Sequence, residues 1–93
     1  MSYTQALQDL FGKLAPAEVA GLEACAGVPG QTAAVPVGEV ADQFWAMLAE
    51  LRWAERGEIV AFDWGRVRKY QITALGAKAM PVLLARCASI KAR

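Results

Sequence analysis

The spacing of apolar residues in this 93-residue sequence changes near residue 58, and this change restricts the possible folds most. Before it, apolar residues recur every three or four positions, as they do on one face of an α-helix. The segments EIVAFDW (58–64) and VRKYQIT (67–73) then alternate apolar and polar residues on either side of a glycine, which is typical of a β-hairpin. Thr73 is a favourable helix N-cap residue, so the sequence predicts a hairpin at about 58–73 and a C-terminal helix at about 74–92.

A two-residue turn at Gly65-Arg66 would set the pairing of the two predicted strands. The facing residues are then Trp64 and Val67, Asp63 and Arg68, Ala61 and Tyr70, and Ile59 and Ile72. This register pairs opposite charges and directs four apolar side chains toward the core, namely Ile59, Ala61, Tyr70 and Ile72. It leaves Phe62, Trp64 and Val67 on the opposite face of the hairpin.

Three helices are expected before the hairpin. They cover about residues 3–14, 16–27 and 37–56, and a loop rich in glycine and proline fills about 27–36. Ser2 and Gln5 form a capping-box pattern, and Pro16 suits the first position of the second helix. Pro81 must kink or restart the C-terminal helix, because proline lacks a backbone donor and clashes with the preceding turn.

Charge is unevenly distributed, although the net charge is only +1. Residues 1–50 carry one lysine and six acidic residues, whereas residues 51–93 carry nine basic and three acidic residues. A polyanionic or acidic partner is one interpretation of this asymmetry, and a solvated face is the other. No apolar stretch is long enough to span a membrane and no signal-peptide pattern is present, so a cytoplasmic location without membrane contact is expected.

The residue types that most often carry catalysis are missing or isolated. The chain has no histidine, the commonest metal ligand and general base near neutral pH. Cys25 and Cys87 lack metal-binding spacing and are expected to be reduced, packed thiols. The scattered carboxylates define no acid/base pair. We therefore expect no enzymatic activity, no cofactor and no metal site.

The segments AELRWAERGEIV (49–60) and GRVRKYQITALG (65–76) resemble the wing and adjoining helix of MarR-like and PadR-like bacterial regulators. The matching positions are Leu51, Gly57 and Ile59 before the wing, and Ile72, Thr73 and Gly76 after it. The resemblance covers residues 48–80, about a third of the chain. It implies an α+β, mainly helical winged-helix domain over residues 1–93, with three N-terminal helices, a two-stranded wing and a C-terminal helix.

The same resemblance implies a small transcriptional regulator that binds double-stranded DNA as a homodimer. Its phosphate contacts would come from the basic wing, Arg66, Arg68 and Lys69, and from Arg52 and Arg56 at the end of the third helix. Gln43 is the residue on that helix suited to reading a base. In the opposing interpretation, Arg68 pairs with Asp63 and the other cations are solvated.

Two features depart from DNA-binding members of this fold. A short turn joins their helix pair, whereas this chain inserts about ten residues with two prolines, within which a short helix at 31–44 stays possible. In addition, the face of the third helix opposite its apolar stripe carries acidic residues, small residues and an indole: Glu39, Asp42, Ala46, Ala49, Glu50 and Trp53.

These departures support an alternative function, a winged-helix adaptor of phage or mobile-element origin that binds another protein. Trp53 and Trp64 would be its interface residues. Apolar residues of the C-terminal helix, Leu83, Leu84, Cys87 and Ile90, are predicted to form the homodimer interface, because so short a chain buries little surface internally.

Overall fold

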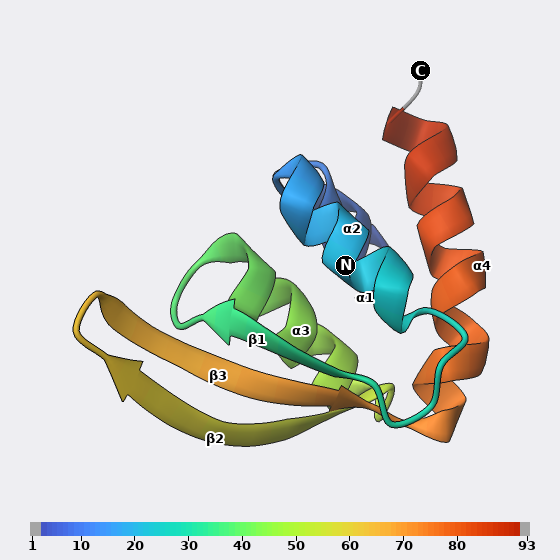
Figure 1. Ribbon diagram of the computed structural model, residues 1–93. Coiled ribbons are helices and arrows are strands. Elements are labelled where there is room, and N and C mark those ends of the chain that lie inside the picture. Colours follow the sequence, from blue (N-terminus) through green and yellow to red (C-terminus); the bar gives the residue numbers. More distant parts are fainter. Residues whose placement is uncertain (1–2, 92–93) are drawn as a thin grey trace.

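The protein has an α+β fold, described by a computed structural model for the backbone of residues 3–91 and the side chains of residues 5–87. Four helices and one antiparallel three-stranded sheet make up this part of the chain. In chain order the elements are α1 (Tyr3–Phe11), α2 (Pro16–Cys25), β1 (Thr32–Pro36), α3 (Val40–Glu50), β2 (Ala54–Phe62), β3 (Gly65–Ile72) and α4 (Ala74–Lys91). Helices α1, α2 and α3 lie on one side of the sheet, and the end of the β2–β3 hairpin extends beyond them (Figure 1).

Strand β1 is the main departure from the predicted order of elements, which placed a loop at 27–36. The sheet order is β1-β3-β2, so β3 is central and β1 pairs with it from Thr32↔Gln71 to Pro36↔Val67. Gly30, at φ 82, turns the chain into this strand, and its N–H donates to the Ile72 carbonyl. Ala33 and Val35 face the core, but alanine gives too weak an apolar alternation for the strand to be recognised.

Helix α3 is shorter at both ends than the predicted 37–56. It ends in a Schellman arrangement, in which the N–H of Trp53 donates to the Leu48 carbonyl and that of Arg52 to the Ala49 carbonyl. Arg52 takes the left-handed conformation at φ 67, where glycine is usual, so a stop at Gly57 was predicted instead. The chain therefore enters β2 at Ala54, and Trp53 lies in the connection rather than on the helix.

The hairpin exists as predicted, but its register is different. Phe62 pairs with Gly65, so Asp63 and Trp64 form the turn and Gly65, at φ 151, follows it. Val60 consequently faces Val67, and Ile59 faces Arg68. A β-bulge between Arg56 and Ile59 places Gly57 so close to Lys69 that a β-carbon would lie 2.8 Å from the Lys69 carbonyl oxygen.

The core lies between the helices and the inner face of the sheet. Its fully buried side chains are contributed by every layer, namely Leu7, Leu22, Phe44, Leu48, Tyr70, Ile72 and Met80. Leu83, Leu84 and Cys87 are also buried in this core, which leaves these side chains little surface for the predicted homodimer interface. The side chain of Ile90 lies outside the described residues. Cys25 and Cys87 are free thiols, and burial raises the pKa of each.

The start of α4 is fixed as the sequence predicts. Thr73 caps the helix, because its Oγ1 accepts a hydrogen bond from the Gly76 N–H at 3.0 Å. The same hydroxyl donates to the Arg52 carbonyl at 2.7 Å, which joins α4 to the end of α3. The helix continues through the exposed Pro81 without restarting. Among the described helices, none has the length and apolar character needed to cross a membrane. The predicted Ser2 cap lies outside the described residues.

Candidate nucleic-acid interface

Two aromatic rings are exposed at the end of the β2–β3 hairpin. Phe62 is 48% exposed and Trp64 is 72% exposed. Their rings are stacked, with centroids 5.1 Å apart and planes only 3° from parallel. Phe62 shares a face of β2 with Val60, whose partner Val67 alternates on β3 with the inward-facing Arg68 and Tyr70, so this face points away from the helices. Val67 itself is buried. The predicted outward position of Phe62 is confirmed, although the turn consists of Asp63 and Trp64 instead of Gly65 and Arg66.

Two of the three predicted wing cations are exposed. Arg66 and Lys69 are three positions apart on β3, so their side chains lie on opposite faces of the strand. Neither forms an ion pair with another described residue. The Arg66 carbonyl accepts a hydrogen bond from the Val37 N–H, which ties the hairpin to the chain just beyond β1. The arrangement gives each face of the hairpin one exposed cation.

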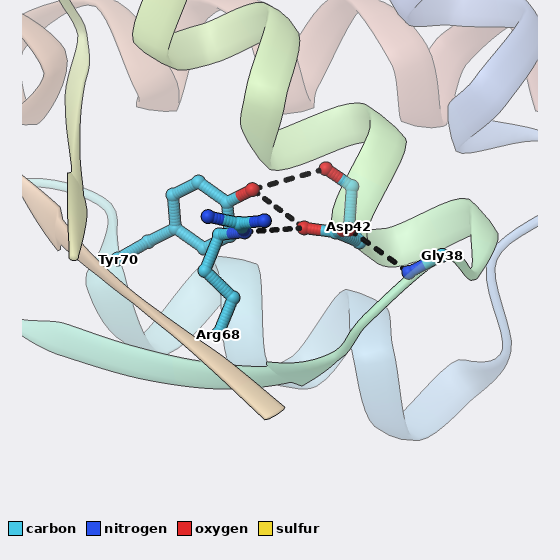
Figure 2. A network of polar contacts seen from close by, with 4 residues as sticks. All are labelled: Gly38, Asp42, Arg68 and Tyr70. Atoms are coloured by element: carbon cyan, nitrogen blue, oxygen red, sulfur yellow. Dashed lines mark hydrogen bonds and ion pairs between the residues drawn. The ribbon is translucent and has the colours of Figure 1, made fainter. Parts of the chain in front are cut away.

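The third wing cation, Arg68, is used inside the protein. It is half-buried, and its Nε lies 3.7 Å from Asp42 Oδ1 (Figure 2). The predicted pairing with Asp63 is wrong, because Asp63 lies in the turn instead of opposite Arg68. A partly buried cation that pairs with an internal carboxylate is largely neutralised by it and contributes little to binding a phosphate. The positive potential of the hairpin is thus smaller than the sequence indicates.

Asp42 is the buried centre of this polar network rather than part of an acidic outer face. It is only 8% exposed, and Oδ2 accepts a hydrogen bond from the Gly38 N–H at 2.9 Å. Its Oδ1 accepts the Tyr70 hydroxyl at 2.5 Å, in the contact shown in Figure 2. Asp42 occupies the first turn of α3, where a carboxylate is favoured by the helix dipole. That position predicts a favourable carboxylate at a helix N-terminus but not its burial, so no sequence signal indicated the inward role of Asp42.

Tyr70 completes the network as a neutral hydrogen-bond donor. Burial raises its pKa, and the hydrogen bond to Asp42 raises it further. The ring is stacked on Trp45, with centroids 5.6 Å apart. Because Asp42 is on α3 while Tyr70 and Arg68 are on β3, the network fixes the hairpin's orientation on the helical body.

The remaining predicted phosphate ligands lie elsewhere. Arg52 and Arg56 line a shallow groove between α3 and β2, together with Glu50 and Glu55. The pKa of Arg56 is raised, first by its interaction with Tyr70 and further by Asp42 and Glu50. Gln43 is exposed on α3, so the structure does not place it on the hairpin. Arg56 and Lys69 line one further surface depression together with Glu55 and Glu58, and neither Arg52 nor Gln43 contributes to it.

The predicted protein interface is also divided. Trp53 is half-buried and packs against the core, whereas Trp64 is exposed at the hairpin end. Glu39 and Glu50 are exposed, but the buried Asp42 does not contribute to an acidic surface. Among the features that suggested an adaptor, the exposed Trp64 on the hairpin is present in the structure. The neighbouring Phe62 ring adds to its exposed aromatic surface.

A separate apolar pocket of about 200 Å³ lies between α2, β1 and α3. Phe44, Trp45 and Val35 contribute to its wall, and Glu18 lies at it with a carboxylate oxygen that accepts the Ala15 N–H. Within the described residues, no group of histidine, cysteine and acidic side chains could hold a metal ion. The hairpin end is therefore the surface where exposed aromatic and cationic groups meet.

Comparison of the chain with protein-family models, with curated proteins and with solved structures gives no match.

Proposed function

We propose that the protein is a small winged-helix-like DNA-binding protein that acts in transcriptional regulation and contacts duplex phosphates through its hairpin. The observation that carries this proposal is the β2–β3 hairpin, whose end extends past the helices (Figure 1). Arg66 lies near that end, and Lys69 lies further along β3, opposite Ala34 of β1, on the other face of the sheet. The sequence resemblance of the hairpin and the start of α4 to a wing and its adjoining helix adds to it.

Cations on both faces suit a ribbon that lies in a DNA groove. Each groove is bounded by two phosphate backbones, so a hairpin inserted between them presents Arg66 to one backbone and Lys69 to the other. Every phosphate neutralised releases condensed counterions, which gives affinity that decreases steeply as salt increases. This source of affinity does not depend on the base sequence.

Base readout by a helix has little support in this chain. Strand β1 occupies the segment between α2 and α3, so these two helices are not joined by the short turn of a helix-turn-helix. Glu39 is exposed at the start of α3, where its carboxylate would repel phosphates. We therefore expect low sequence selectivity.

The test is a fluorescence-anisotropy titration with a random-sequence duplex between about 50 and 200 mM salt. Each cation that contacts a phosphate contributes about −0.9 to the slope of log affinity against log salt, so Arg66→Ala with Lys69→Ala should flatten the slope by about two. The control pair, Lys13→Ala with Arg86→Ala, removes the same charge from exposed positions outside the hairpin. Absence of duplex binding at low salt, or equal slopes for the two double variants, would refute the proposal.

A further inference from the structure

Exposed aromatic rings at the hairpin end are not needed for phosphate contact. Trp64 and Phe62 are among the most exposed large apolar side chains described, and they belong to one stacked pair. Exposing two such rings to water is unfavourable, because burying their apolar surface would lower the free energy. The two rings are stacked with parallel planes, so each covers part of the other, and the ring face that points outward from the pair can accept another flat group.

The surroundings of the ring pair favour a nucleic-acid base as that group. Lys69 lies on the same outer sheet face. The row of residues between it and the rings is apolar and at most partly exposed (Val60, Val67 and Pro36), whereas the exposed positions level with and beyond Lys69 are small or polar (Ala34, Gln71 and Thr32). A protein interface usually has a larger apolar centre, whereas single strands are bound by aromatic platforms beside cationic grooves. Glu55, opposite Gln71, carries a negative charge at the far end of this face and limits where a phosphate can approach.

The distances along the hairpin also fit a nucleic-acid strand. Phe62 is level with Gly65, and Lys69 lies four residues further along β3. At about 3.3 Å per residue this separation is about 13 Å, or roughly four steps of a stacked strand at 3.4 Å. A base on the rings and a phosphate at Lys69 can thus belong to one continuous strand.

We propose that the Phe62–Trp64 pair stacks on unpaired bases, so that the protein prefers a duplex with a short single-stranded gap to a fully paired duplex. This inference rests on the proposed DNA-binding function. In a paired duplex both faces of each base are covered by its neighbours, and a ring can reach them only after unstacking, which is unfavourable. A gap removes that requirement while leaving duplex phosphates for Arg66 and Lys69.

The experiment compares affinities of the full chain for a blunt duplex and for the same duplex with a gap in one strand. Stacking of a base on an aromatic ring is worth enough for at least about a fivefold preference for the gapped DNA. Phe62→Ala and Trp64→Ala should reduce this ratio to about one, with blunt-duplex affinity changed by less than about twofold. Trp64→Phe preserves a ring and should keep the preference, and Val82→Ala, exposed on α4, is the matched control.

Trp64 fluorescence provides a second readout. Gapped DNA should quench the emission of the wild type and of Val82→Ala, but much less that of Trp64→Phe, because Trp45 and Trp53 lie away from the hairpin end. Equal affinity of the wild type for both DNAs, or an unchanged preference in Trp64→Ala, would overturn the inference and leave the proposed function standing. Failure to bind either DNA would refute both. A response to anionic phospholipid vesicles but to neither DNA would assign the ring pair to a membrane surface and likewise overturn the inference.

Discussion

At Gly76, the first turn of α4 passes against the backbone of Trp53. A β-carbon at this position would overlap the Trp53 carbonyl oxygen, and that oxygen already accepts the Thr73 N–H. The Thr-x-x-Gly spacing noticed in the sequence therefore has two physical causes. Thr73 caps the helix and bonds the Arg52 carbonyl, while glycine permits the close approach.

We expect Gly76→Ala to lower the free energy of unfolding by about 1–3 kcal/mol, because the backbones must separate to admit the methyl group. Urea denaturation followed by circular dichroism measures the change. The matched control is Gly21→Ala in the exposed part of α2, where a β-carbon would meet nothing within contact distance. It should instead stabilise the protein slightly, by up to about 1 kcal/mol. Equal stability of the two variants would contradict the packing described at Gly76.

Tyr70 should give the protein a measurable sensitivity to alkaline pH. Its pKa is raised in the folded state by burial and by the Asp42 hydrogen bond, relative to about 10 in an unfolded chain. As pH rises through about 10, the unfolded state loses the phenolic proton first, so the free energy of unfolding falls until the folded pKa is passed. Tyr70→Phe should remove this component. Denaturation curves for both proteins between about pH 8 and 11 provide the measurement, and a parallel decline would contradict it.

At the scale of the elements, the hairpin was predictable from its alternating apolar residues, but its register was not. Gly65 indicated the turn only to within two residues, because a glycine can form a turn or follow one. Strand β1 was missed because its two alanines and terminal proline provide little strand signal. The end of α3 was misplaced because an arginine, not a glycine, adopts the left-handed conformation there.

The hairpin cations should separate into two roles when replaced singly. Arg68→Ala removes the partner of a largely buried carboxylate, so it should lower the free energy of unfolding by about 1–3 kcal/mol. It should change duplex affinity by less than about twofold, because its charge is already used by Asp42. Arg66→Ala should have the opposite pattern. The free energy of unfolding should stay almost unchanged, whereas duplex binding should become weaker and less dependent on salt. Denaturation and anisotropy on the same samples test both, and loss of DNA binding in Arg68→Ala at intact folding would count against this division.

At the scale of the molecule, the sequence shows that the C-terminal half has a net charge of +6. It does not show which of these cations are free to contact a partner. Asp42 and Tyr70 are separated by 28 residues, so their contact, and with it the internal use of Arg68, follows only from the folded arrangement. The radius of gyration, 12.5 Å, is close to the value of about 12 Å for a compact chain of this length. Such compactness explains why Leu83, Leu84 and Cys87 fill the protein's own core. A homodimer stays a prediction that needs another surface.

The most direct test of hairpin-mediated binding is a map of backbone amide chemical shifts in isotope-labelled protein as duplex DNA is added at low salt. We expect the largest changes at residues 58–69, with smaller changes along the exposed face of α3 around Gln43. Changes centred on α3 or α4 with an unaffected hairpin, or no changes at any residue, would contradict DNA binding through Arg66 and Lys69.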